Sequence, residues 1–387
     1  MAEVATAPAW LEERRRQGAS LAESLPLPDQ KAKGWEFTDL SGLDLSAYEE
    51  ASATPVVSGA EGATVVSLAE ALGSHGELLH ERLGSLVPVE GDPFVARNEA
   101  GWRDGVLVHV PKGVRLSEPI QIEVPVELSG AAVSWRTLVV LEEGAEAEVW
   151  EHCASQGDET AGLLNSVVEL RVGPAATLRY VSTQDISERA WIFATQRAQV
   201  ERDGRLDWAA LGFGSARGKV RMETKLAGPG SEARVTGGYA GGAGQHLDYD
   251  TTQEHAAPNT NSDLAFRGVL AAGATAVWRG MIKVDPGAQQ TDAFQESRNL
   301  LLSPEAHADA IPGLEILADD VRCTHAAAIA QVDKDQLFYL TSRGLDDETA
   351  KALIIEGFLE SLVERLAEGP VRDSISEALE TRLAEIL

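Results

Sequence analysis

The stretch Val167-Val-Glu-Leu-Arg-Val-Gly-Pro-Ala-Ala-Thr-Leu-Arg-Tyr-Val181 contains the two signals that decide the fold. Polar and apolar side chains alternate on both sides of the Gly173-Pro-Ala175 turn, which is typical of strands with one buried face. Similar alternation recurs between about residues 95 and 345, at Val133–Val140, Glu232–Val235 and Thr275–Gly280. Turns of glycine and a small residue recur just ahead of strands, at Glu143–Ala145, Gly228–Gly230, Ala272–Ala274 and Pro286–Ala288.

Many short strands separated by such turns predict a coiled stack in which each turn of chain buries its face on the next. We therefore expect a mainly β protein built on a right-handed parallel β-helix, although the uneven spacing gives no strict repeat. A β-sandwich is the alternative, and Asp104-Gly105 and Asp203-Gly204 would then be hairpin turns. The glycine-rich run Gly237–Gly244 is expected to be a flexible or tightly turned crossing, since glycine mostly marks turns.

Helical patterns flank this β-rich part. Leu68–Gly73 and Leu78–Gly84 are predicted helices that end at glycine, and Gly34–Leu40 ahead of them is predicted to be a short docking strand. After residue 345, Asp346 and Asp347 are expected to cap a long helix, which a second amphipathic helix follows. The predicted regions are residues 1–95 (helical and irregular), 96–345 (β-helix core) and 346–387 (C-terminal helices).

Composition excludes several classes of function. The chain has 387 residues and a net charge of -28, a field that repels nucleic acid and anionic lipid. Two cysteines form no disulfide framework, so reduced thiols in a cytoplasmic protein are expected. Residues 1–16 lack the apolar core of a signal peptide, and no apolar run approaches the ~20 residues that span a bilayer.

Cys323-Thr-His325 is the candidate metal-binding pair. Residues two apart in an extended segment point to the same face, so a thiolate and an imidazole could bind iron, copper or zinc together. The alternative is a buried cysteine beside a hydrogen-bonded histidine. His152 and Cys153 are adjacent and would face opposite sides, so they are not expected to share a metal.

Other chemistry has little support in the sequence. There is no P-loop, so no nucleotide site is expected, and there is no Gly-x-Ser-x-Gly, His-Glu-x-x-His or Cys-x-x-Cys motif. A denser set of ligand-type residues is either a metal or substrate patch or a solvated face of the coil. Its members are Asp248, Asp250, Glu254, His255 and Asp263. A β-helix carbohydrate-active enzyme, either a lyase or a hydrolase, would need aligned carboxylates, which these residues do not show clearly.

Several segments resemble the SufB/SufD family of iron–sulfur cluster assembly proteins. The resemblance is continuous over roughly the last 130 residues and resumes at Gly34–Leu40. Its segments are Asn259–Gly268, Gly280–Val284, Thr291–Ser303, Glu315–Gly344 and Gly344–Leu359.

Two positions indicate the SufD branch of the family. SufB-like chains carry a cysteine after the Leu-Leu pair, and Leu300–Ala306 has none. SufD-like chains carry Cys-x-His further on, which Cys323 and His325 match. Ala326–Ala328 stands where the family usually has Gly-Ala-Thr, a departure that loses a glycine and a hydroxyl and leaves the ligand pair intact.

The resemblance implies a non-enzymatic scaffold with a central β-helix between helical regions. It implies a heterodimer with SufB through the β-helices and binding of the ATPase SufC through the C-terminal helices. Cys323 and His325 would face SufB and acquire iron or hold a nascent iron–sulfur cluster transiently. Two ligands cannot complete a tetrahedral iron site, so the partner would supply the others. A homodimer that passes metal without SufB is a further alternative.

Overall fold

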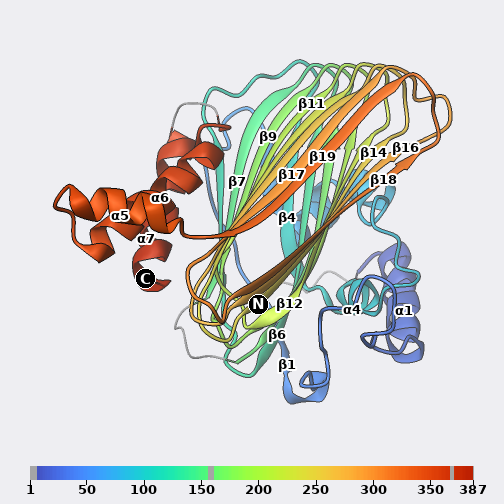
Figure 1. Cartoon of the computed structure of the whole chain (residues 1–387). Helices are drawn as coiled ribbons and strands as arrows, with labels where there is room; N and C mark the ends of the chain where they lie inside the picture. Colours follow the sequence, from blue (N-terminus) through green and yellow to red (C-terminus); the bar gives the residue numbers. More distant parts are fainter. Residues whose placement is uncertain (1–6, 156–160, 367–369, 387) are drawn as a thin grey trace.

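The computed structural model describes residues 7–155, 161–366 and 370–386, and strands that coil into a solenoid form most of it (Figure 1). From β4 to β19, even-numbered strands lie in sheet A and odd-numbered strands lie in sheet B. One strand of each sheet makes one turn, here called a rung, and the eight rungs run from β4–β5 to β18–β19. Neighbouring rungs pair in parallel, so the predicted parallel β-helix is confirmed and the β-sandwich is wrong.

The strands of sheet A are β3 (Thr64–Ser67), β4 (Asp104–Val110), β6 (Ala131–Leu141), β8 (Leu163–Val172), β10 (Trp191–Val200), β12 (Arg217–Leu226), β14 (His246–His255), β16 (Thr275–Val284) and β18 (His307–Ile316), with β1 (Glu49–Ala51) beside β6. Those of sheet B are β2 (Val56–Ser58), β5 (Ile120–Val126), β7 (Glu146–Ser155), β9 (Thr177–Asp185), β11 (Arg205–Gly212), β13 (Glu232–Gly241), β15 (Asn261–Leu270), β17 (Thr291–Leu301) and β19 (Val321–Gln331). The helices are α1 (Ala9–Ser24), α2 (Leu68–Ser74), α3 (Gly76–Arg82), α4 (Pro93–Gly101), α5 (Lys334–Ser342), α6 (Asp347–Val363) and α7 (Pro370–Ile386), with a 3-10 turn, η1 (Leu45–Ala47). None of these described helices has the length and apolar content that crossing a membrane requires.

In-register stacking explains the core between the sheets. Alternate residues of each strand point inward, as in β5, where buried and exposed residues alternate along the whole strand. The inward Leu170 of β8 lies between Val139 of β6 and Ala198 of β10, and all three are buried. Each fully buried Val or Leu side chain contributes roughly 1.5–3 kcal/mol to folding, so the interior column stabilises the stack along its length.

The N-terminal region packs on the solenoid through sheet A. Trp35 is buried beside Phe94 and Phe193, with ring centroids 5.5 and 6.2 Å away. Thr38 donates a hydrogen bond to Asp248 of β14 at 2.5 Å. The prediction of a strand at Gly34–Leu40 is wrong, because side-chain contacts hold this segment and its backbone forms turns and irregular structure.

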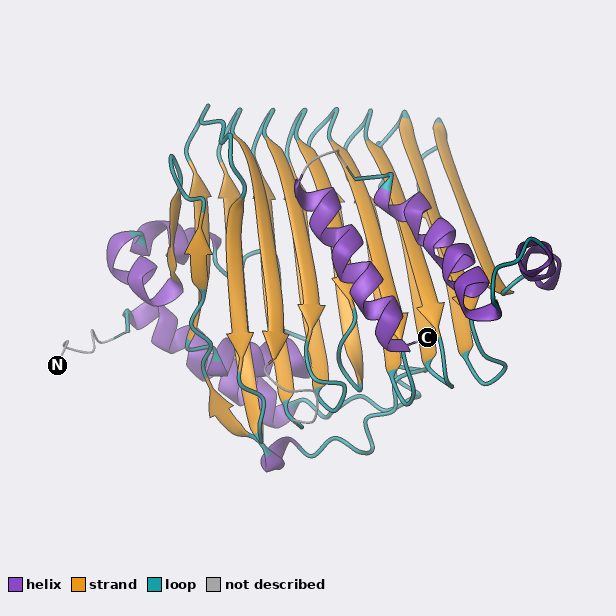
Figure 2. Cartoon of the chain, turned by 90° about the vertical axis from the view of Figure 1, so that its left-hand side faces the viewer, coloured by secondary structure: helices purple, strands orange, loops and turns teal. Residues whose placement is uncertain are grey.

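The C-terminal helices α6 and α7 lie across the outer face of sheet B (Figure 2). Asp346 caps α6 by accepting a hydrogen bond from the Thr349 amide, as predicted. The glycine-rich run is not a flexible crossing over its first half, because residues 237–241 belong to β13. A Cβ at Gly238 would lie 2.9 Å from Leu362 Cδ2, so this glycine lets α6 approach the sheet closely.

The two predicted hairpin turns have other roles. Gly105 lies inside β4, where a Cβ would come within 2.0 Å of the Arg136 carbonyl oxygen, so only glycine fits. Asp203, with a φ of 58°, lies in the turn between β10 and β11. These strands belong to different sheets, so the turn is a corner of the solenoid and forms no hairpin.

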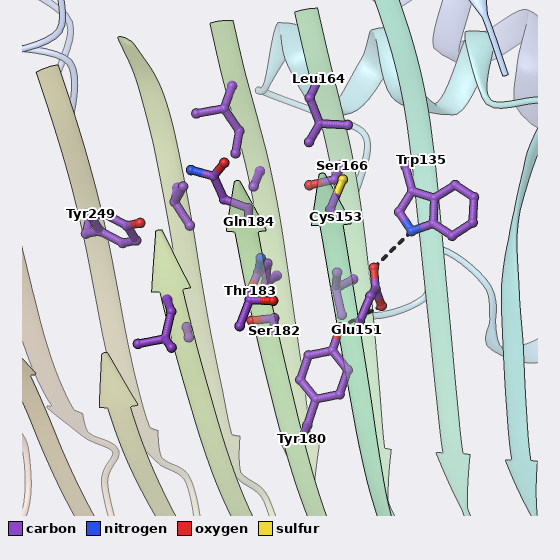
Figure 3. Close-up of a pocket in the computed structure, with 17 residues that line it drawn as sticks. Trp135, Glu151, Cys153, Leu164, Ser166, Tyr180, Ser182, Thr183, Gln184 and Tyr249 are labelled. Atoms are coloured by element: carbon purple, nitrogen blue, oxygen red, sulfur yellow. Dashed lines mark hydrogen bonds between the residues drawn. The ribbon is translucent and has the colours of Figure 1, made fainter. Parts of the chain in front are cut away.

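A cavity of about 50 Å³ lies between the sheets, in the rungs from β6 to β14 (Figure 3). Its wall includes Glu151 and Cys153 of β7, which point into the solenoid. The Glu151 carboxylate accepts hydrogen bonds from Trp135 Nε1 (3.0 Å), Thr137 Oγ1 (2.9 Å) and the Tyr180 hydroxyl (2.8 Å). Burial raises the pKa of Glu151, and these three donors offset part of that shift.

We expect Glu151→Gln to flatten the dependence of stability on pH. The raised pKa means that the folded state binds the Glu151 proton more tightly than the unfolded chain, so wild-type stability falls as pH rises above the unfolded value near ~4.3. Relative to the wild type, the variant's free energy of unfolding should rise by up to about 1.4 kcal/mol per pH unit. The rise should stop once the pH exceeds the pKa of Glu151 in the folded state. Urea unfolding from pH 5 to pH 8 measures this. Glu127→Gln, at an exposed carboxylate, is the control, and parallel wild-type and Glu151→Gln curves would contradict the assignment.

Candidate metal site

Strands β18 and β19 form the last rung, and each pairs on one side only. β18 pairs with β16 and β19 pairs with β17, and the described residues place no strand beyond them. Their free edges present backbone N–H and C=O groups that a further strand could bind. This end of the solenoid, here called the open end, therefore leaves both the sheet edges and the interior of the last rung uncovered.

Cys323 and His325 both lie on the inward face of β19. Cys323 is in register with Ala293 of β17, and it packs against the inward cluster that contains Ile282 and Val284. His325 is in register with Gln295. The two side chains therefore share one face of an edge strand and point into the opening of the solenoid.

The two candidate ligands differ from the residues beneath them in exposure. Ala293 and Gln295 on β17 are buried, whereas Cys323 is only partly buried and His325 is exposed. An ion could reach both side chains from the open end without passing through the core. The same two positions would become enclosed if another molecule covered the last rung.

Burial raises the pKa of the Cys323 thiol, and the negative charge of Asp292 adds to the effect. The thiol is therefore the favoured form at neutral pH, and a metal that binds the sulfur must displace its proton. The pair suits a soft or borderline metal, because thiolate and imidazole are the ligands such ions prefer.

Two ligands do not make a complete site. Over residues 7–155, 161–366 and 370–386, the structure brings no three His, Cys, Asp or Glu side chains together in a way that could hold a metal ion. A tetrahedral zinc or iron centre needs four ligands. This chain can therefore supply half of such a centre at the open end.

Gln295 forms the floor beneath His325. Its side-chain amide donates hydrogen bonds to the carbonyl oxygens of Gly280 (3.2 Å) and Gly313 (3.1 Å). Gly280 belongs to β16 and Gly313 to β18, so the glutamine links sheet B to two strands of sheet A across the interior. The separation of the two sheets at the open end is thereby fixed one rung below the candidate ligands.

Apolar side chains line the open end. Leu314, Ile316 and Ile329 belong to the last rung and are 37%, 39% and 45% exposed, and the nearby Leu317 is 54% exposed. Large apolar side chains that gather in one patch mark an interaction surface. The open end therefore combines apolar contacts, free strand edges and two metal-type ligands.

The other candidate ligands do not converge. Cys153 points inward and is buried, while His152 points outward and pairs with Glu123 at 2.9 Å, so the two face opposite sides as predicted. Asp248 is buried and accepts a hydrogen bond from Lys219 at 2.7 Å. His255 is buried between Thr260 and Ser262, and burial lowers its pKa to about 4.

The remaining members of that acidic set are paired on the surface. Glu254 binds Lys283 at 2.8 Å, and Asp263 binds Arg365 of the C-terminal region at 3.1 Å. Asp250 lies 3.8 Å from Lys219 and 3.5 Å from Arg279. The set is therefore neither one metal patch nor one solvated face, because its members have different partners on different sides of the solenoid.

The cavity around Glu151 is a less suitable metal site than the open end. It holds one free thiol, Cys153, whose pKa is raised by burial and by the charge of Glu151. The oxygens of Glu151 already accept three hydrogen bonds. Cys323 and His325, by contrast, have no hydrogen bond or ion pair to another side chain among those the structure describes.

The sequence pattern singled out Cys323 and His325 as candidate ligands, whereas Gln295 and Glu151 were not predicted. Both missed residues are polar at inward positions of otherwise apolar strands, and that departure from the alternating pattern was the available signal. Reading it requires knowing which face of each strand points inward.

Two known protein families match this chain. A family described as the SufBD core domain of SUF-system FeS cluster assembly matches residues 126–358. A second, described as the SufBD protein N-terminal region, matches residues 46–122. Together they extend from the N-terminal strands through the solenoid and into α6.

Curated relatives include iron–sulfur cluster assembly SufBD family proteins from Staphylococcus epidermidis, Staphylococcus haemolyticus and Staphylococcus aureus. Each is 30% identical over 296 residues, which cover 76% of this chain. The chain spans 64% of the length of these relatives. The chain belongs to the SufBD family of iron–sulfur cluster assembly proteins.

Proposed function

We propose that this chain is a SufD-type scaffold subunit that pairs with SufB, binds the ATPase SufC and helps to acquire iron for new clusters. The observation that carries the proposal is the position of Cys323 and His325, on the inward face of an edge strand at an uncovered apolar end. Family membership favours this role over the carbohydrate-active enzyme.

The open end supports pairing with another solenoid. Its two free edges, β18 and β19, lie in different sheets, so a partner with two edge strands could extend both sheets at once. Burial of Leu314, Ile316 and Ile329 would add the apolar contacts that stable interfaces have at their centre. We assign this surface to SufB, and self-pairing of this chain is the alternative outcome.

Iron is the cargo of this site. Cys323 would bind as thiolate and His325 as neutral imidazole, and SufB would supply the remaining ligands across the interface. Such a shared site would hold the metal only transiently, because separating the two subunits removes half of its ligands. The partly exposed Cys323 is accessible before the partner covers it.

SufC binding is assigned to the surface formed by Phe338 and Tyr339 of α5 and Leu353 of α6, here called the α5–α6 surface. These side chains are 73%, 55% and 44% exposed, and no residue of α5 is buried. Exposed aromatic residues are the usual anchors of protein interfaces. The short helix beyond the last strand in Figure 2 is α5, which extends away from the solenoid.

The docking helix and the ligand strand are joined directly. β19 ends at Gln331 and α5 begins at Lys334, so two residues separate them. Movement of SufC during its ATP cycle would act on α5 and, through this short link, on the strand that carries Cys323 and His325. The scaffold would then open or close the site without catalysing a reaction itself.

We expect Cys323→Ser to lower the iron retained by the purified assembly by about tenfold or more, since loss of a supporting group around a metal already costs 10–100-fold in affinity. Fold and complex formation should persist, because the side chain is small and only partly buried. Iron analysis of the complex with SufB and SufC measures the effect. Cys153→Ser is the matched control, and equal iron in wild type and Cys323→Ser would refute the ligand assignment.

Metal capture should weaken as pH falls. Binding displaces the Cys323 proton, so below the raised thiol pKa the apparent affinity should drop by up to about tenfold per pH unit for one proton released. Titration of the SufB complex with Fe²⁺ under anaerobic conditions from pH 6 to pH 8.5 tests this. Cys323→Ser should give a shallower slope, and a pH-independent wild type would contradict the thiolate role.

Substituting both Phe338 and Tyr339 by alanine should weaken SufC binding by about tenfold to a hundredfold, the effect of losing anchors worth roughly 1.4–2.8 kcal/mol. Truncation after residue 345 should abolish binding, because it also removes α6, the main contact of α5. Calorimetric titration with SufC measures both. Val56→Ala, at a residue 63% exposed on β2, is the control, and unchanged binding in the double variant would exclude this surface.

A further inference from the structure

We propose that strand β17 relays the position of helix α6 to the candidate metal site through Arg267, Glu296 and Gln295. The inference rests on the proposed function and adds positioning residues that act on the site without touching the metal. Gln295 and Glu296 are consecutive on β17, so one side chain points into the solenoid and the other points out toward α6.

On the outer face, Arg267 of β15 connects α6 to β17. Its guanidinium donates to Glu296 Oε1 at 2.5 Å and to the Ser361 hydroxyl of α6 at 3.4 Å. The side chains of Arg267 and Glu296 are 6% and 11% exposed, so solvent screens this ion pair little. An ion pair held away from water is sensitive to geometry, because breaking it leaves an uncompensated charge.

Apolar contacts join α6 to the same strands. Leu359 and Leu362 of α6 share a buried cluster with Val269 of β15 and Leu300 of β17. Val332, in the link between β19 and α5, packs against this cluster as well. A shift of α6 would therefore act on β15, on β17 and on the segment that follows the ligand strand.

On the inner face, Gln295 is fully buried and is the in-register neighbour of His325. Its amide ties β17 to the Gly280 and Gly313 carbonyl oxygens across the interior. Its Oε1 atom is buried and accepts no hydrogen bond, so nothing described in the chain fixes the acceptor side of this amide. Displacement of β17 would change the floor under His325 and the width of the opening.

The test uses the full complex with SufB and SufC in a Cys153→Ala background, so that Cys323 is the one thiol of this chain. The readout is the rate at which iodoacetamide alkylates Cys323, with and without ATP, quantified by mass spectrometry of the peptide. The parent complex should show an ATP-dependent change in this rate. Ser361→Ala, which removes the hydrogen bond between Arg267 and α6, and Glu296→Gln, which breaks the ion pair, should each reduce that change, while the apolar contacts of α6 remain.

Two controls separate the relay from loss of structure. Ser376→Ala removes a hydroxyl of α7 that bonds within its own helix, to the Arg372 carbonyl oxygen. Arg298→Gln removes a 56% exposed arginine that pairs with Glu296 from the same strand. Both should keep the ATP response. If Glu296→Gln lowers the melting temperature more than Arg298→Gln does, the exchanged pair Arg267→Glu with Glu296→Arg is measured instead and should recover the response.

The outcomes distinguish the relay from the function on which it rests. A parent complex that responds to ATP, with Ser361→Ala and Glu296→Gln responding equally, would overturn the relay and leave the proposed function intact. A parent in which this chain binds neither partner, or in which ATP leaves the Cys323 rate unchanged, would overturn both. Loss of the response in Ser376→Ala as well would also overturn the relay, because any weakening of the helices would then suffice.

Discussion

In-register stacking of parallel strands is the constraint on which the rest of the structure depends. Each inward side chain is covered by the side chain at the same position of the next rung, as Leu170 is covered by Val139 and Ala198. The inward side chains of the last rung lack this cover, because the described residues place no strand beyond β18 and β19. At the first rung, β3 and β2 pair with the edges of β4 and β5, so the uncovered end belongs to the last rung, where Cys323 and His325 lie.

The helical regions divide the remaining surfaces of the solenoid between them. The N-terminal segment covers part of sheet A through Trp35 and Thr38, and α6 and α7 cover part of sheet B. The edges of the last rung stay free, and the helix that follows them, α5, buries none of its side chains. One end of the molecule thus holds the free strand edges, the candidate ligands Cys323 and His325, and the exposed aromatic residues Phe338 and Tyr339.

The sequence predicted features that depend on local periodicity. Alternation identified the strands, and a two-residue spacing put Cys323 and His325 on one face of β19. Features set by distant neighbours were missed. Gly238 lies in a strand, where its missing side chain leaves room for Leu362 of α6. The irregular segment Gly34–Leu40 is held by contacts with residues far along the chain, such as Asp248. Likewise, Glu151 is stabilised by Tyr180 from the next rung.

The contact between Thr38 and Asp248 has a consequence for synthesis of the chain. The two residues are separated by 210 positions, and Glu36 reaches still further, to Arg279. Neither bond can form until β14 and β16 have left the ribosome and stacked in the correct register. The N-terminal segment is synthesised early but can dock fully only after the six rungs from β4–β5 to β14–β15 have formed.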